Sequence, residues 1–295
     1  MHWFVARTFR TGVAILQTMG LDRAANFASA VARTLGPLFP ENRLGAENIA
    51  TCLPEKSADE RKRILAGAWD SLARVAAEYI HLDAIAAQEP VVEGEGEGRF
   101  VIRGVEHFLS LRDDGKPGII FAAHLANWEL LAVTAVRYGL PLTAMFQPPS
   151  NMLVAGDLLQ RRRELMGGLV PSYRGATFEL VAALERGEHL GLLVDQAKPR
   201  GMQIPFFERP APTNPLLGKL ARQFDCPVHG ARSVRLPGER FLIEITPPLD
   251  LPRDAEGKID VYGAMVAVNQ TVEGWVREHP EQWLWLHNRW MLPGR

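Results

Sequence analysis

Residues 118–131 read GIIFAAHLANWELL, an apolar run that passes into polar side chains and then into a helical pattern. The run is short and follows a Lys-Pro-Gly turn, which predicts a buried β-strand. Asn127 is a favourable N-cap residue, and Glu129 falls in the first turn of the predicted helix, where its charge suits the helix dipole. His124 lies between strand and helix, where ligands and catalytic groups collect in an α/β sheet.

His124 and Glu129 form a candidate catalytic pair. The loop can fold the imidazole back over the first helical turn, within reach of the Glu129 carboxylate. A carboxylate there fixes the imidazole tautomer and stabilises its protonated form, so that the other ring nitrogen can take a proton from a hydroxyl. This is the base half of a catalytic triad without a serine nucleophile. By spacing alone, however, an isolated histidine at a strand end is more often a hydrogen-bonded structural residue.

Composition excludes several classes of protein. The chain has 295 residues, enough for one large domain or two small ones, with 47% hydrophobic and 23% charged residues, as in ordinary globular proteins. Its net charge of −1 provides no basic field, so we expect no nucleic-acid partner. The two cysteines, Cys52 and Cys226, fit neither a disulfide framework nor a zinc site, which favours a reducing, cytoplasmic setting.

Strands and helices alternate along the chain from Phe100 onward. We expect strands at 100–102, in the run before His124, and at 142–146, 169–171, 190–194, 227–231 and 241–245, the last two paired with each other and finishing the sheet. We expect helices at 105–111, from Asn127 to about 138, and at 151–166, 176–185, 216–224 and 261–277. This alternation predicts an α/β fold with a central, mostly parallel sheet flanked by helices.

A helical lead-in precedes this α/β region. Residues 43–82 read as two helices, and Ser57 and Glu60 form a capping box at the start of the second. Residues 3–19 carry an apolar run that Arg7 and Arg10 interrupt. The run falls short of the roughly 20 apolar residues that a membrane-spanning helix needs.

The first 40 residues therefore have two interpretations. An amphipathic helix can lie on a membrane with its apolar side chains down and its arginines toward anionic headgroups. An ordinary helix packed on the domain fits equally well. We divide the chain into an N-terminal membrane-associating segment, residues 1–40, and a main domain, residues 41–295.

Two motifs carry a resemblance to a known family. The sequence Ala-His-Leu-Ala-Asn-Trp-Glu-Leu, with His124 and Glu129, resembles the H-x4-D/E signature of glycerolipid-type acyltransferases. Its Asn-Trp-Glu segment resembles the corresponding segment of the late acyltransferases of bacterial lipid A biosynthesis. Residues 280–289, PEQWLWLHNR, resemble the Pro-Glu-Gln-aromatic-x-Trp-x-His-x-Arg ending of that family. The resemblance covers the chain roughly from Asn48 to the end and implies an acyltransferase domain in residues 41–295.

The resemblance also implies roles for site residues. His124 would be the general base and Glu129 its support. Arg162, with Arg161 and Arg163 as alternatives, matches a family arginine that would contact a phosphate or an oxyanion.

Four further positions join the predicted substrate site. Arg174 also matches a family arginine and would face a phosphate. Asp195 and Gln196 resemble the family's Asp-Gln pair and would orient substrate or hold structure near His124, although an aspartate at a strand end is often only a turn residue. Backbone N–H groups at the Asn127 helix start would help to bind an oxyanion.

The expected reaction is O-acyl transfer from an acyl carrier protein thioester to a hydroxyl of a lipid A precursor. The resemblance places it at the cytoplasmic face of the bacterial inner membrane, with the protein peripheral or anchored by its N-terminal helix. No cofactor is expected besides the thioester co-substrate. No metal is expected either, because the histidine pattern is not His-Glu-x-x-His. Alternatives are a lysophospholipid or other glycolipid acyltransferase, a hydrolase or thioesterase with the same dyad, and a non-catalytic membrane-associated binding protein.

Overall fold

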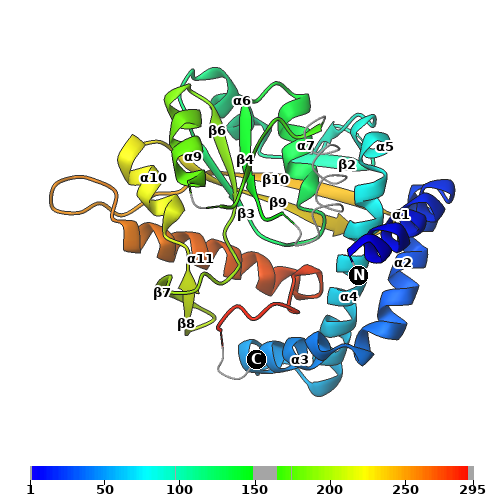
Figure 1. Ribbon diagram of the computed structural model, residues 1–295. Helices are drawn as coiled ribbons and strands as arrows, with labels where there is room; N and C mark the ends of the chain where they lie inside the picture. Colours follow the sequence, from blue (N-terminus) through cyan, green and yellow to red (C-terminus); the bar gives the residue numbers. More distant parts are fainter. Residues whose placement is uncertain (1, 97, 149–164, 174, 292–295) are drawn as a thin grey trace.

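An eight-stranded sheet forms the centre of the computed structural model, which describes residues 2–96, 98–148, 165–173 and 175–291 (Figure 1). From edge to edge the strands are β1 (Val91–Val92), β2 (Phe100–Arg103), β10 (Arg240–Pro248), β9 (Val228–Leu236), β3 (Ile119–Ala122), β6 (His189–Leu193), β4 (Leu142–Phe146) and β5 (Gly168–Pro171). All neighbours pair in parallel except β9 with β10. The predicted α/β fold with a mostly parallel sheet is confirmed.

The antiparallel hairpin β9–β10 lies in the middle of this sheet. The two strands pair with each other as expected, but they do not finish the sheet at its edge. β10 continues in parallel to β2, with Phe241 opposite Phe100, and β9 lies parallel to β3. β9 is buried over its first seven residues, as a strand covered on both faces should be.

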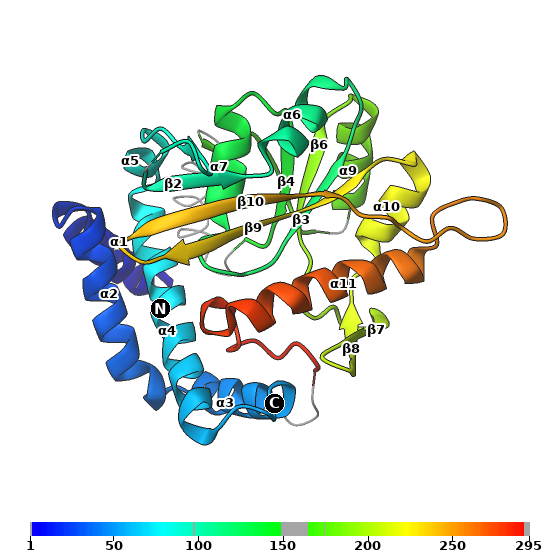
Figure 2. The same ribbon diagram turned by 180° about the vertical axis from the view of Figure 1, so that it is seen from behind.

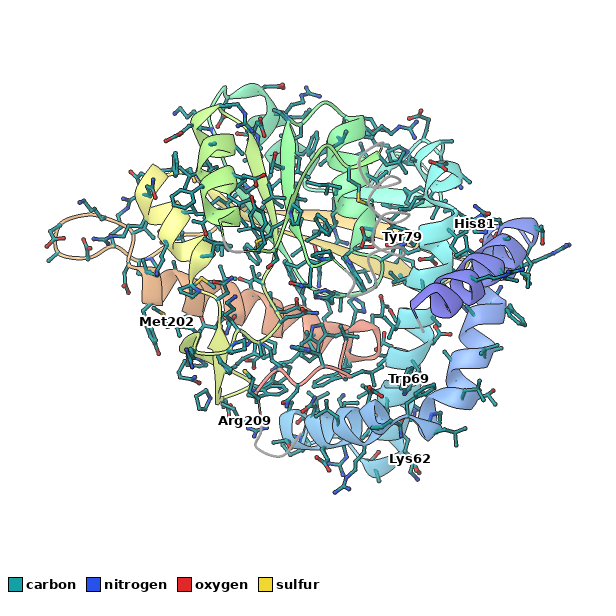
Figure 3. The ribbon with its side chains drawn as sticks, viewed as in Figure 1. Lys62, Trp69, Tyr79, His81, Met202 and Arg209 are labelled. Carbon is teal, nitrogen blue, oxygen red and sulfur yellow. The ribbon has the colours of Figure 1, made fainter. Side chains whose placement is uncertain are left out.

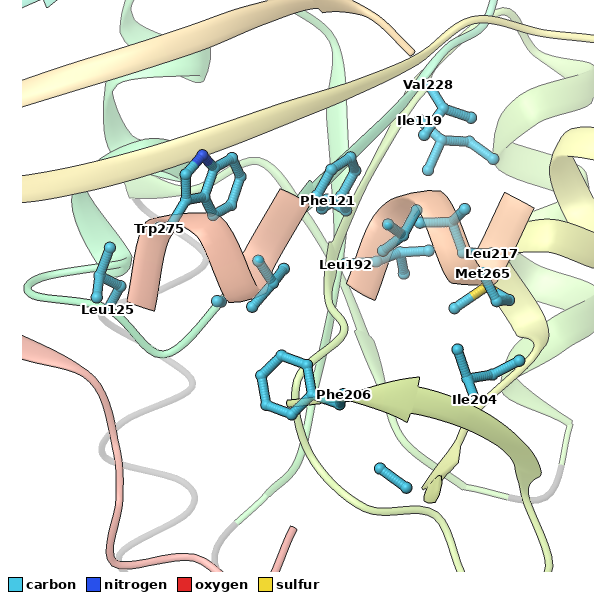
Figure 4. Close-up of a cluster of buried hydrophobic side chains, with 14 of the residues drawn as sticks. Ile119, Phe121, Leu125, Leu192, Ile204, Phe206, Leu217, Val228, Met265 and Trp275 are labelled. Atoms are coloured by element: carbon cyan, nitrogen blue, oxygen red, sulfur yellow. The ribbon is translucent and has the colours of Figure 1, made fainter. Parts of the chain in front are cut away.

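Helices cover both faces of the sheet. Successive side chains of β3 point to opposite faces, and all four are buried, so both faces are packed against other elements. On one face Phe121 stacks on Trp275 of α11 (Val261–Glu278), with ring centroids 5.6 Å apart (Figure 4). A Cβ added to Gly230 would lie 2.9 Å from Trp275, so this close contact requires glycine. On the other face Ile120 packs in one cluster with residues of α6 and α7. The remaining bounds are α6 (Val105–Asp113), α7 (Glu129–Arg137), α9 (Ala176–Glu185) and α10 (Leu216–Phe224).

The predicted N-terminal helical lead-in is present beside the sheet (Figures 1 and 2). It consists of α1 (His2–Thr18), α2 (Leu21–Leu35), the short 3-10 helix η1 (Gly36–Leu38), α3 (Pro40–Cys52), α4 (Ala58–Ile80) and α5 (Leu82–Ala86). The capping box of Ser57 and Glu60 opens α4 as predicted. Figure 3 labels Trp69 and Tyr79 on α4 and His81 just after it. Trp69 Nε1 donates to Asn42 of α3 at 3.0 Å. Tyr79 packs in a cluster with Phe100 and Phe241 of the sheet, and His81 Nε2 lies 3.1 Å from the carbonyl of Leu16 of α1.

A small antiparallel hairpin, β7 (Met202–Phe206) and β8 (Arg209–Thr213), lies below the sheet together with the C-terminal segment (Figure 1). That segment begins with the 3-10 helix η2 (Pro280–Gln282). Phe206 is buried between Trp283 and Trp290, with ring centroids 5.6 and 5.9 Å away. Asn48 of α3 donates hydrogen bonds to two carbonyls of the C-terminal segment. The hairpin and the C-terminal segment thus share one apolar core.

The predicted helix at 151–166 lies almost wholly outside the described residues. Within the described ranges, no helix combines the length and the hydropathy that crossing a bilayer requires.

Candidate active site

The loop of residues 123–128 joins β3 to α7 and carries His124. The Asn127 Oδ1 accepts a hydrogen bond of 3.2 Å from the Glu129 N–H, so Asn127 caps α7 although the helix begins only at Glu129. Ala126 has a φ of 44°, which is unfavourable for a residue with a Cβ. Its N–H donates to the carbonyl of Gln282 at 3.0 Å, so the C-terminal segment stabilises this conformation.

Asp195 fixes the position of His124. His124 Nδ1 lies 2.8 Å from Asp195 Oδ1, and the His124 backbone N–H donates to Asp195 Oδ2, also at 2.8 Å. Trp283 Nε1 donates to the same Oδ2 at 2.8 Å. β3 and β6 are parallel neighbours, with Ala122 opposite Leu193, so the segments that follow them meet at the carboxyl edge of the sheet. This arrangement explains why two residues 71 positions apart come together.

The charge of Asp195 decides the tautomer of His124. Burial alone would raise the pKa of Asp195, but the charge of His124 and the hydrogen bonds from His124 and Trp283 outweigh it and lower the pKa to about 2. A carboxylate can only accept hydrogen bonds, so Nδ1 of His124 carries the proton and donates it. In the neutral imidazole Nε2 then keeps its lone pair, and in the imidazolium both ring nitrogens carry a proton. The side-chain nitrogen of Gln196, an exposed residue, lies 3.4 Å from this Nε2.

Glu129 was expected to orient His124, yet the contact at Nδ1 is made by Asp195. Glu129 is buried at the start of α7 and accepts a hydrogen bond from Trp128 Nε1 at 3.2 Å. The Trp128 ring meets the His124 ring edge-on, with centroids 4.8 Å apart. Trp128 therefore contacts both Glu129 and His124. The predicted support of His124 by Glu129 stays a prediction.

A cavity of about 380 Å³ opens between the sheet and helices α6 and α7. Most of its lining side chains are apolar, among them Ile120, Leu131 and Ala135. Trp128 and Glu129 line it as well, which links the cavity to His124. Its volume falls in the range of about 300–1,000 Å³ typical of small-molecule sites, and its apolar lining suits a hydrocarbon chain.

The structure brings together His124, Asn127, Glu129, Asp195 and Gln196 of the predicted site. Arg162 and Arg174, with the neighbours of Arg162, lie outside the described residues.

Sequence reasoning missed two residues of this site. Trp283 lies in the motif of residues 280–289, but nothing in that motif marked its indole N–H as a donor to Asp195. Glu78 was counted only as part of a helix, and its burial beside Asn127 was not expected. The available signal was a charged residue among the apolar side chains of Val75, Ala77 and Tyr79.

His287 and Arg289 hold the C-terminal segment in place. His287 Nε2 accepts a 3.0 Å hydrogen bond from the Ala197 N–H, just after Asp195 and Gln196. Arg289 is fully buried and donates to the carbonyl of Pro212 at 3.0 Å and to Thr213 Oγ1 at 2.7 Å. Burial lowers its pKa to about 10, even though the charge of Asp195 acts in the opposite direction.

Comparison with known proteins assigns the chain to a family. A family model described as bacterial lipid A biosynthesis acyltransferase matches residues 2–291. The lipid A biosynthesis palmitoleoyltransferase of Escherichia coli (strain K12) is 24% identical over 252 residues, which cover 83% of this chain and 77% of the relative. Lipid A biosynthesis acyltransferase 2 of Shigella flexneri is 26% identical over 265 residues, with 87% and 80% covered. The chain therefore belongs to the bacterial lipid A biosynthesis acyltransferase family, as its two motifs predicted.

Proposed function

We propose that this protein transfers a fatty acyl chain from an acyl carrier protein thioester to a hydroxyl group of a lipid A precursor. The observation that carries the proposal is the hydrogen bond between His124 Nδ1 and the ionised Asp195, because it leaves Nε2 with a lone pair for a hydroxyl proton. The relatives are named for lipid A biosynthesis, which supports the acceptor.

The proposed step needs no covalent enzyme intermediate. Nε2 of His124 takes the proton of the acceptor hydroxyl as the oxygen attacks the thioester carbonyl. The tetrahedral intermediate collapses, the carbon–sulfur bond breaks, and the leaving thiolate takes the proton from the imidazolium. Asp195 stabilises the imidazolium between these transfers, as a buried carboxylate does for histidine in hydrolytic triads. Glu129 would add a second negative charge nearby.

An oxyanion develops on the thioester oxygen during the attack and needs hydrogen-bond donors. We assign this role to backbone N–H groups at the Asn127 helix start, just before α7, where the positive end of the helix dipole lies, and to Arg162. Arg174 and Gln196 would contact the acceptor, Arg174 through a phosphate group.

The acyl chain of the donor would occupy the cavity between the sheet and helices α6 and α7. The apolar lining supports this assignment, and so does the position of Trp128 between the cavity and His124. A chain held there would direct its carbonyl carbon toward the loop of residues 123–128. This placement is the proximity that the attack requires.

We further propose that the protein acts at the cytoplasmic face of the inner membrane and docks there through its N-terminal helices. One side of α2 and the turn after it present exposed apolar side chains, which we call the α2 stripe: Phe27, Val31, Leu35, Leu38 and Phe39. The opposite side of α2 is buried at Ala25 and Ser29. Arg23, an exposed arginine one helical turn before Phe27, suits anionic headgroups.

The test of the proposed function is the identity of the product. Purified protein is incubated with an acyl carrier protein thioester and either a lipid A precursor, a lysophospholipid or no acceptor, and the lipids are measured by mass spectrometry. We expect an acylated lipid A precursor from the wild type and none from the His124→Ala protein. Free fatty acid as the main product would show a thioesterase, and acylated lysophospholipid alone would show a different acceptor. Tight lipid binding without turnover would indicate a binding protein.

A further inference from the structure

Glu78 is a buried carboxylate that the proposed chemistry does not use. It lies near the end of α4 with 1% of its surface exposed, and its two oxygens accept three described hydrogen bonds. Arg235 of β9 donates two of them, at 2.6 and 3.0 Å. Asn127 Nδ2 donates the third, at 2.8 Å. Glu78 thus joins the helical lead-in, the middle of the sheet and the loop that carries His124.

The bond to Asn127 reaches the first turn of α7. The amide nitrogen of Asn127 faces Glu78, and its amide oxygen accepts from the Glu129 N–H at 3.2 Å. Each end of this fully buried amide has a complementary partner, so the amide has one orientation. Asn127 transmits the position of Glu78 to the segment between His124 and Glu129.

Arg235 makes a second connection to the same loop. Its backbone N–H donates to Gln282 Oε1 at 2.7 Å, and Gln282 Nε2 donates back to the Arg235 carbonyl at 3.0 Å. The carbonyl of Gln282 in turn accepts from the N–H of Ala126, the residue with a φ of 44°. Ser71 of α4 donates to the same carbonyl at 3.3 Å. The loop is thus held on one side by Asn127, which binds Glu78, and on the other by Gln282, which binds the backbone of Arg235.

The ion pairs of Arg232 provide a comparison, because the carboxylates in them have a purely structural role. Arg232 lies three residues before Arg235 on β9 and is also buried. It pairs with Glu244 of β10 and Glu278 of α11. Those partners hold strand to strand and strand to helix, whereas the partners of Glu78 include the loop of His124.

We propose that Glu78 is a positioning residue, which holds Asn127 and, with Arg235, keeps the loop of residues 123–128 in the conformation that acyl transfer requires. The inference rests on the proposed function for its kinetic consequence. Glu78 touches neither substrate nor the reacting atoms, so its effect passes through Asn127 and Ala126. A loop whose geometry is lost lowers kcat more than it raises KM.

The test exchanges donor and acceptor between the two side chains. Asn127→Asp places two carboxylates against each other, and Glu78→Gln removes the charge that Arg235 and Asn127 share. The double variant, with both changes, again gives one carboxylate and one amide and keeps the charge of the cluster. The matched control is Glu244→Gln, which removes a carboxylate paired with an arginine of β9 away from the loop.

We expect each single variant to lower kcat at least about 10-fold with KM changed by less than about 3-fold, measured on protein whose folded fraction is known. The double variant should recover most of the loss, and Glu244→Gln should keep kcat within about 2-fold of the wild type. Wild-type kcat in both single variants would overturn the inference. A double variant that loses as much as the two single variants combined would also overturn it.

A second measurement separates this inference from the proposed function. The low-field NMR signal of the His124 Nδ1 proton, which is hydrogen-bonded to Asp195, reports the loop geometry without any turnover. We expect it in the wild type and in Glu244→Gln, and we expect it to shift or broaden in Asn127→Asp. If the wild type shows no acyl transfer, the proposed function fails but this signal still tests the role of Glu78. An unchanged signal in Asn127→Asp contradicts the inference even if the wild type is active.

Discussion

Asp195 is the residue on which the orientation of His124 depends most. Its carboxylate accepts two hydrogen bonds from His124 and one from Trp283. The Asp195→Asn change keeps the size of the side chain but removes the charge and presents an amide N–H where an acceptor is needed. We predict that it lowers kcat/KM roughly 10²–10⁴-fold, the usual contribution of an oriented general base.

The Trp283→Phe change provides the graded comparison. It removes one of the three hydrogen bonds and keeps the aromatic packing, so we predict a loss of only about 3–10-fold, as expected for about 1 kcal/mol. Steady-state kinetics of the two variants, measured side by side, test whether Asp195→Asn loses more kcat/KM than Trp283→Phe. Equal losses in both variants would show that the indole, and not the charge of Asp195, governs His124.

At the scale of elements, strand β6 lines the cavity, and Gly191 is a position on it where a larger side chain would reduce the cavity volume. A Cβ there would lie in ordinary contact, 3.5 Å from the Cβ of Ala144, so a side chain fits at its base. We predict that Gly191→Leu fills part of the cavity and shifts the preference toward shorter acyl donors by about 10-fold or more in the ratio of kcat/KM values. Gly191→Ala should shift it less. An unchanged chain-length profile in Gly191→Leu would place the acyl chain elsewhere.

The α2 stripe is the element that we expect to touch the membrane. Phe27 and Leu35 are exposed, so replacing both with serine should leave the fold intact. We predict that the double variant binds vesicles containing anionic lipid at least about 10-fold more weakly. The reason is that two apolar side chains are no longer transferred from water into the membrane. The matched control is Phe178→Ser, which removes an exposed phenylalanine from α9. Equal binding by the double variant and the control in a vesicle sedimentation assay would argue against docking through α2.

At the scale of the whole molecule, buried histidines make stability depend on pH. Burial lowers the pKa of His189, His229 and His287 below the ordinary value. The unfolded chain therefore binds more protons than the folded protein once the pH falls below about 6.5, and the free energy of unfolding decreases as the pH falls from about 7 to about 5. Urea denaturation at several pH values measures this slope, and His189→Gln should make it shallower. A free energy that stays constant or rises toward pH 5 would contradict the prediction.

Local signals in the sequence were enough for most of the fold. The helices at 176–185 and 216–224 have the predicted bounds because glycine and proline residues and apolar periodicity mark their ends. The central position of β9 and β10 was not predictable, because strand order depends on pairings between distant segments. The resemblance placed Asp195 near His124, but its direct bond to the imidazole was not predictable from spacing along the chain, because parallel pairing of β3 and β6 brings the two residues together.

The most direct test of the central claim is the rate of acyl transfer by the His124→Gln protein. Glutamine can still hydrogen-bond to Asp195, so the loop keeps its support, but it cannot accept a proton from the acceptor hydroxyl. We predict a rate roughly 10²–10⁴-fold below that of the wild type, with a melting temperature within a few degrees of it. A rate within a few-fold of the wild type, with the same acylated lipid as product, would contradict the role of His124 as the base.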